Sequence, residues 1–138
     1  SAIENSRKDQ TLNTPAVATL IMLENQVRWL NDNGGLAWAS ARCARSASLL
    51  YQWAEKSDYA SPFVNDRNAR SNAVVTIDIN DGINASQVVA ALSENGIVDT
   101  NGYRKLGRNQ LRIGVFPSVE PSDVDALTRC IDYVVEHL

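Results

Sequence analysis

The feature that most constrains the fold is a glycine pair, Gly34-Gly35, which separates two long helical patterns. Before the pair, apolar side chains recur every three or four residues, and this spacing predicts a helix. They are Val17, Leu20, Leu23, Val27 and Leu30. Thr14-Pro15 predicts the start of that helix, with threonine as N-cap and proline as the first helical residue. A second helix is predicted from about Leu36 to Ser57, so the chain begins with a helical region.

The rest of the chain changes to the pattern of a small sheet interleaved with helices. Residues 73–79 are rich in β-branched side chains and end at the turn sequence Asn80-Asp81-Gly82, which predicts a strand. The elements predicted here are a surface loop over 58–70, the strand over 73–79, a helix from Asn84 to Asn95-Gly96, a very short strand at Ile97-Val98, a strand over 110–116 and a helix from Pro121. The order α-α-β-α-β-β-α predicts an α+β fold, an α/β sandwich in which helices pack on one face of a small sheet.

Length and charge limit the functional classes. A chain of 138 residues suffices for one domain with a core. Its net charge of −3 lacks the global basic surface of a nucleic-acid-binding protein, so any anion site is local. No apolar run approaches the ~20 residues of a membrane span. Cys43 and Cys130 belong to no CxxC or Cys/His cluster, which predicts the absence of a metal site and the reduced thiols of a cytoplasmic protein.

The beginning of the chain is polar and does not start with methionine. Residues 1–12 predict no capped element of their own, and we expect a tag remnant followed by an interdomain piece of a longer protein. Residues 13–138 are expected to form a small C-terminal domain together with the helix that leads into it.

Positive charge concentrates in one segment. Between Asp99 and Glu120 the chain carries four cations and no acidic residue. They are Arg104, Lys105, Arg108 and Arg112. Guanidinium groups beside glycine-containing turns suit a bound carboxylate or phosphate, although a solvated basic loop has the same composition. Arg112 favours the anion site, because an arginine inside an apolar strand must either reach water or meet a buried negative partner.

A second candidate anion site precedes the first long helix. Asn13 and Thr14 add side-chain donors at a predicted helix N-terminus, where free backbone N–H groups favour a phosphate. Nucleophilic arrangements are missing, since Cys43 has no histidine partner and His137 stands next to the chain end. We therefore expect no catalytic residue in this chain.

Four motifs together indicate a family. They are Asn13-Thr14-Pro15, Asn33-Gly34-Gly35, Gly96-Ile97-Val98 and the stretch from Tyr103-Arg104 to Arg112. In this order and spacing they resemble the C-terminal portion of the phosphoserine aminotransferase family, in its actinobacterial form. The resemblance implies the small domain of a class V, fold-type I enzyme, a homodimer that uses pyridoxal 5′-phosphate bound mainly by a large domain absent from this chain.

The resemblance also implies roles for single residues. Asn13 and Thr14 would reach the cofactor phosphate of the neighbouring subunit. Arg112 would hold the substrate α-carboxylate, and Tyr103 with Arg104 would hold the substrate phosphate or the distal carboxylate of glutamate. Tyrosine stands at 103 where better-known members have histidine. The stretch to Arg112 is also two residues longer, which leaves open whether Lys105 or Arg108 joins the phosphate contact.

The implied reaction of the whole protein converts 3-phosphohydroxypyruvate and glutamate to phosphoserine and 2-oxoglutarate, a step of serine biosynthesis. The chain's lysines do not resemble the cofactor-linked lysine, so the fragment alone should be inactive. They are Lys8, Lys56 and Lys105. Two alternatives stay open: a stand-alone module that senses an amino acid, and another class V aminotransferase whose substrate carries no phosphate.

Overall fold

The computed structural model describes all 138 residues, and the chain divides into two compact units, residues 1–36 and 37–138. The first unit begins with the short helix α1 (Ala2–Ser6). Ser1 Oγ accepts from the Glu4 backbone N–H, and the Glu4 side chain accepts from the Ser1 amino group, which forms a capping box. The prediction of no capped element in residues 1–12 was therefore wrong, because the Ser1-to-Glu4 spacing is itself a capping signal.

The long helix of the first unit is α2 (Val17–Asp32). It begins two residues later than predicted, because Ala16 has a ψ of 76° and is not helical. Ala16 is the N-cap and no side chain caps the helix, so the predicted capping role of Thr14 was wrong. The glycine joint is confirmed: Gly34 and Gly35 have φ of 110° and 65°, a left-handed region that other residues rarely adopt.

The second unit holds an antiparallel sheet of three strands in the order β1-β2-β3. They are β1 (Ala60–Pro62), β2 (Val74–Ile79) and β3 (Gln110–Gly114). The predicted strands over 73–79 and 110–116 are confirmed. β1 lies where a surface loop was predicted. The predicted strand at Ile97-Val98 is absent, and Asn101 instead forms a single bridge with Leu111.

The two faces of the sheet differ, because side chains alternate along each strand. One face is buried and includes Val75, Ile77, Leu111 and Ile113. The pairs Val74–Gly114, Thr76–Arg112 and Asp78–Gln110 lie on the opposite face. We call this second face, together with Ser61, the open face of the sheet.

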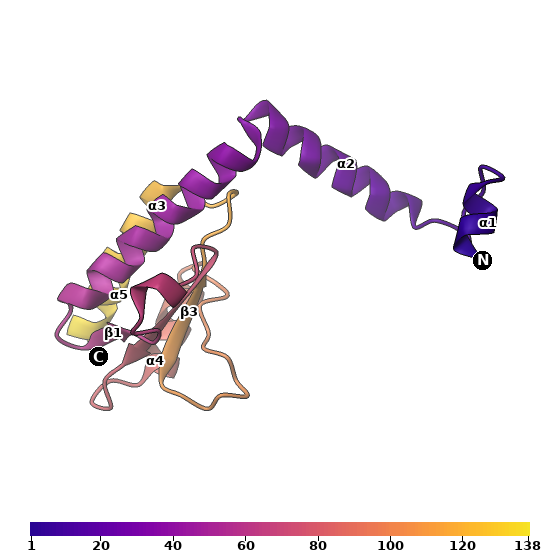
Figure 1. Cartoon of the computed structure of the whole chain (residues 1–138). Helices are drawn as coiled ribbons and strands as arrows, with labels where there is room; N and C mark the ends of the chain where they lie inside the picture. Colours follow the sequence, from indigo (N-terminus) through magenta and orange to yellow (C-terminus); the bar gives the residue numbers. More distant parts are fainter. The chain divides into compact units, whose positions relative to one another are not determined.

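Three helices cover the buried face. They are α3 (Gly35–Lys56), α4 (Ala85–Glu94) and α5 (Pro121–Glu136). Within the second unit, α3 and α5 run side by side along the sheet (Figure 1). The side chains shared by the core come from all three helices and from the sheet; among them are Leu50, Ile77, Val88, Leu92, Leu111, Val124 and Ile131. The predicted α+β fold is confirmed. None of the helices is both long and apolar enough to cross a membrane.

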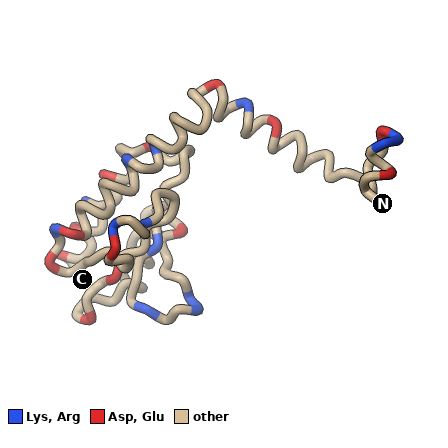
Figure 2. The backbone as a smooth tube through the Cα atoms, in the orientation of Figure 1, with Lys and Arg blue, Asp and Glu red and all other residues tan.

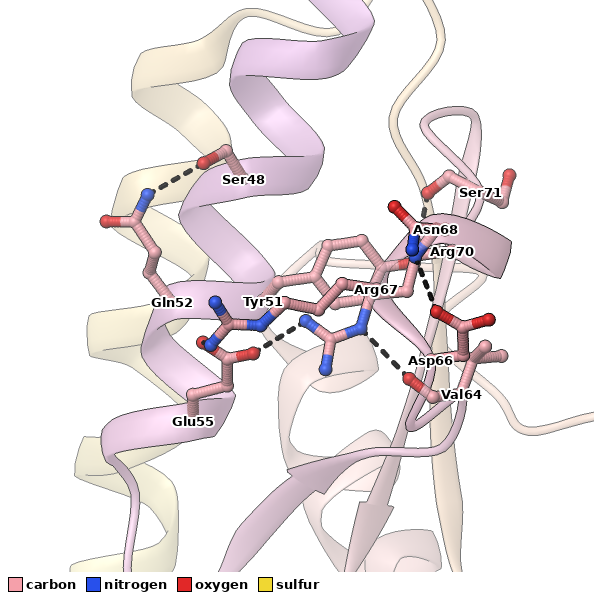
Figure 3. Close-up of polar contacts among 10 residues, drawn as sticks. All are labelled: Ser48, Tyr51, Gln52, Glu55, Val64, Asp66, Arg67, Asn68, Arg70 and Ser71. Atoms are coloured by element: carbon pink, nitrogen blue, oxygen red, sulfur yellow. Dashed lines mark hydrogen bonds and ion pairs between the residues drawn. The ribbon is translucent and has the colours of Figure 1, made fainter.

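A polar cluster fastens the connection between β1 and β2 to α3 (Figure 3). Glu55 accepts from Arg70 at 2.6 Å and from Arg67 at 3.0 Å. Tyr51 donates to the Ser71 carbonyl, and the Arg70 guanidinium lies 4.8 Å from the centre of the Tyr51 ring. The hydrogen bond from Arg70 holds the pKa of the Glu55 carboxyl below its usual range. Residues 63–73 therefore form an ordered connection that includes η1 (Arg67–Ala69).

Candidate functional site

Arg112 stands in β3 and projects from the open face of the sheet. Its strand partner is Thr76. The side chain is exposed and forms no ion pair, so of the two predicted alternatives it reaches water rather than a buried negative group. Its guanidinium carbon lies 5.8 Å from the centre of the Tyr103 ring, within the range of a cation–π contact. The structure thus brings together Tyr103 and Arg112, two of the predicted substrate contacts.

Residues 102–108 form a loop that leads into β3, and we call it the basic loop. The Leu106 N–H donates to the Tyr103 carbonyl at 2.9 Å, which closes a turn, and Gly107 has a φ of 66°. Figure 2 shows positive positions and no negative ones along this loop, which Figure 1 colours orange. Arg104 and Lys105 are exposed at its tip and form no ion pair. Both cations are therefore available to an anion.

A cavity of about 660 Å³ lies between the basic loop, β3 and the start of α4. Its lining includes Tyr103, Arg104, Arg108 and Arg112, and Ser86 from α4. This volume falls in the range of small-molecule sites. The cavity therefore joins all three predicted substrate-binding residues, Tyr103, Arg104 and Arg112, in one concave surface that also includes Arg108 and the acidic residue Asp99.

A second cavity of about 840 Å³ shares Arg112 and Asp99 with the first and is mainly apolar. Phe116, Val119 and Leu127 contribute to its lining. Thr100 also lines it, and the Thr100 Oγ1 atom is buried without a hydrogen-bond partner. Arg112 and the acidic residue Asp99 therefore border both cavities.

Arg108 departs from the expected uncompensated charge of the segment. Its Nε and Nη2 atoms donate to the two carboxylate oxygens of Asp78, at 3.2 Å and 2.8 Å. These hydrogen bonds and the charge of Asp78 raise the pKa of the Arg108 guanidinium. Sequence reasoning missed the pair because Asp78 lies in β2, 30 residues earlier, and only the register of the sheet brings it close.

Asn109 is a second residue that sequence reasoning missed. Its Nδ2 atom donates to the carbonyls of Ile79 and Ile83, at 3.0 Å and 2.7 Å, and its Oδ1 atom accepts from the Ala85 N–H at 2.8 Å. The side chain therefore ties the end of the basic loop to the start of α4. No local signal marks this role, because all three partners lie in residues 79–85, at least 24 residues before Asn109 in the chain.

Asn13 and Thr14 belong to the first unit. They lie in residues 9–15, which border an open polar hollow of about 910 Å³. Both side chains are exposed and offer amide and hydroxyl donors that suit a phosphate. Because α2 begins at Val17, they stand before the helix N-terminus rather than in its first turn.

Comparison with known proteins agrees with the resemblance to phosphoserine aminotransferases. No family model matches the chain. It is 61% identical over 137 residues to the phosphoserine aminotransferase of Rhodococcus opacus strain B4, and 60% identical to that of Rhodococcus jostii strain RHA1. Each match covers 99% of this chain.

The chain belongs to the phosphoserine aminotransferase family. It spans only 37% of the length of these relatives.

Solved structures agree on the fold. A phosphoserine aminotransferase from Cytophaga hutchinsonii matches 95% of the chain and 36% of its own length with a TM-score of 0.81 at 20% identity. The cysteine desulfurase CsdA from Escherichia coli matches 94% of the chain and 33% of its own length with a TM-score of 0.71 at 28% identity. The same architecture therefore occurs in proteins named for different reactions, and the side chains of the site must distinguish among them.

The lysines of this member of the family are all exposed. Lys8 lies after α1, Lys56 ends α3 and Lys105 is at the tip of the basic loop. A lysine that forms a covalent bond to a carbonyl cofactor is normally desolvated or placed beside another cation in a pocket. Lys8 and Lys56 have no such surroundings, and Lys105 is open to water.

Proposed function

We propose that the whole protein transfers the amino group of glutamate to 3-phosphohydroxypyruvate, and that this chain supplies the substrate-recognition region. The observation that carries the proposal is the cavity beside the open face of the sheet, where Arg112 and Arg104 stand without ion pairs at separate places. Both substrates of the reaction carry an α-carboxylate and a second, distal anion. A site with two separate cations matches that pair of charges.

Each cation has a distinct role in the proposal. Arg112 binds the α-carboxylate, since its planar guanidinium can donate two parallel hydrogen bonds to a carboxylate. Arg104 binds the distal phosphate or carboxylate, and Tyr103 contributes a neutral hydroxyl donor. The Tyr103 ring lies under the Arg112 guanidinium and limits the directions in which that guanidinium can point.

The cofactor in the proposal is pyridoxal 5′-phosphate, bound mainly by the region of the protein outside this chain. Its ring, when bound, accepts the electron pair released from the substrate Cα atom. Asn13 and Thr14 fit its phosphate, because both expose donor groups with no competing protein partner in an open polar hollow. In the same proposal, residues 13–138 are the small domain with its leading helix and residues 1–12 precede it. The whole protein is a cytoplasmic homodimer.

A second candidate is a class V aminotransferase with a substrate that lacks phosphate. This candidate stays open because the fold alone does not select a substrate. An aspartate aminotransferase from Thermus thermophilus has a similar fold, with a TM-score of 0.68 at 19% identity. Such an enzyme needs Arg112 but has no use for the free cations of the basic loop. A stand-alone sensing module is a weaker alternative, because it gives no reason for 61% identity to an aminotransferase.

The test uses the full-length protein with pyridoxal 5′-phosphate and glutamate, and measures the 2-oxoglutarate formed. We expect rapid turnover with 3-phosphohydroxypyruvate and a kcat/KM at least about a hundredfold lower with pyruvate, which lacks the distal anion. The isolated 138-residue chain, treated identically, should show no turnover. Equal kcat/KM for the two acceptors would favour the second candidate and contradict the proposed function.

A further inference from the structure

Arg108 is the one cation of the basic loop that is already paired. Its guanidinium makes two hydrogen bonds to the Asp78 carboxylate and lies 5.1 Å from the centre of the Phe63 ring. Asp78 Oδ1 also accepts from Gln110 Nε2 at 2.6 Å. Asp78 of β2, Arg108 at the end of the basic loop and Gln110 of β3 therefore meet at one carboxylate, and Phe63, the residue after β1, lies against the Arg108 guanidinium.

The position of that carboxylate matters for Arg112. Asp78 pairs with Gln110 and Thr76 pairs with Arg112, so Asp78 and Arg112 are diagonal neighbours on the open face. Diagonal neighbours on one face lie roughly 7–8 Å apart, which is about one Debye length at physiological ionic strength. Asp78 is the only acidic residue among the strand residues of the open face. Left unpaired, its charge would oppose an anion approaching Arg112.

We infer that Arg108 is a positioning residue that acts through Asp78 and does not contact the substrate. It neutralises the carboxylate of the open face and fixes the end of the basic loop. The positive charges of Arg104, Lys105 and Arg112 are then not offset by Asp78 and are available to an anionic substrate. Of the two residues that could join Arg104 at the distal anion, Lys105 is the one left free, since it forms no ion pair. The inference rests on the proposed function for the identity of that anion.

A double substitution in the full-length protein separates this role from direct binding. Arg108→Gln exposes the Asp78 charge and should raise both the KM for 3-phosphohydroxypyruvate and the Kd for inorganic phosphate by about tenfold. Asp78→Asn alone should raise neither, because the site loses a negative charge while the carbonyl oxygen of the new amide can still accept a hydrogen bond. The double variant should return both constants to within about threefold of the parent, since the two effects act through one pair.

The controls match the chemistry of the pair. Arg129→Gln breaks an exposed ion pair with Asp125 on α5 and should change neither constant. Melting curves test whether every variant is folded. If Arg108→Gln does not fold, Arg108→Lys replaces it: this variant keeps the positive charge beside Asp78, so its KM and phosphate Kd should stay near those of the parent. A double variant as weak as Arg108→Gln would show that Arg108 binds the anion directly and would overturn the inference. So would a tenfold loss in Asp78→Asn, or a parent protein that does not bind phosphate. A parent that binds phosphate but does not turn over 3-phosphohydroxypyruvate refutes the proposed function alone, because the phosphate Kd still tests the role of Arg108.

Discussion

At the scale of single residues, one carboxylate joins α5 to the elements beside it. Asp132 Oδ1 accepts from Trp53 Nε1 at 2.9 Å and from the Tyr59 hydroxyl at 2.7 Å. The Trp53 and Tyr59 rings meet edge to face with centres 6.2 Å apart. Burial, and then the hydrogen bond to Asp132, raise the pKa of the Tyr59 phenol above its ordinary value.

This shift predicts the behaviour of the chain at alkaline pH. Above the ordinary tyrosine pKa of about 10, the unfolded chain releases the phenolic proton while the folded chain retains it, so the free energy of unfolding falls as pH rises. The Tyr59→Phe variant should lose about 1 kcal/mol of unfolding free energy at pH 7, because the hydrogen bond to Asp132 is missing. Above pH ~10 its unfolding free energy should fall less steeply with pH than that of the parent. Urea unfolding at both pH values measures the difference.

The matched control is Tyr133→Phe, because Tyr133 is 63% exposed on the same helix as Asp132. It should leave both the stability at neutral pH and the alkaline slope as they are in the parent. Identical alkaline slopes in the parent and in Tyr59→Phe would contradict the account of Tyr59.

From the sequence, the kind of ligand that single residues suit was easier to predict than the side chains with which they pair. The prediction that Arg104 and Arg112 bind an anion rests on their residue types and on a segment without acidic residues. The pairing of Arg108 with Asp78 and the contacts of Asn109 did not follow, because they depend on strand register and on a helix start far away in the chain. Which of the free cations contacts a substrate stays a prediction.

At the scale of elements, α2 stands out because none of its residues is buried. Seven of its large apolar side chains are 38–63% exposed; they are Val17, Leu20, Ile21, Met22, Leu23, Val27 and Trp29. A group of exposed large apolar side chains on one helix is typical of a contact with another region of a protein or with another chain.

The exposed surface of α2 predicts that the 138-residue chain binds a hydrophobic dye and self-associates. Replacing both Leu20 and Ile21 by Gln should raise the dissociation constant of the associated form at least about tenfold, since each buried aliphatic side chain contributes on the order of 1.5 kcal/mol. Gln26→Ala, a polar position of the same helix, is the control. Sedimentation velocity and dye fluorescence are the measurements. A monomer that leaves the dye dark would refute this prediction.

Elements with a strong periodic pattern were predictable, and short ones were not. β2 combines β-branched residues with alternating burial, and α5 begins at Pro121 as expected. β1 contains only Ala60-Ser61-Pro62, and no local preference marks it as a strand. It forms because Ala60 and Pro62 can pair with Ile79 and Ile77 of β2. Ile97-Val98 has strand composition but pairs with no strand: the Ile97 N–H donates to the Leu92 carbonyl, and Thr100 and Asn101 make the contacts with β3.

At the scale of the whole molecule, one face of the sheet belongs to the core and the proposed recognition residue Arg112 projects from the other. Its buried face contributes to the core with three helices, while its open face presents Arg112 beside the basic loop. Substitution of Arg112 or Arg104 is therefore expected to change substrate binding without unfolding the second unit. Proteins of similar fold can be named for different reactions, as with CsdA.

The central claim is that Arg112 and Arg104 recognise the two anionic ends of one substrate, and the direct measurement is kcat/KM in the full-length protein with two acceptors. Arg112→Ala should lower kcat/KM roughly a hundredfold or more with both 3-phosphohydroxypyruvate and pyruvate, because each carries an α-carboxylate. Arg104→Ala should cause a loss of similar size with 3-phosphohydroxypyruvate and almost none with pyruvate, since only the former has a distal anion. Arg129→Ala, an exposed position of α5, serves as the control. Equal losses for both acceptors in Arg104→Ala, or no loss with 3-phosphohydroxypyruvate, would contradict the account.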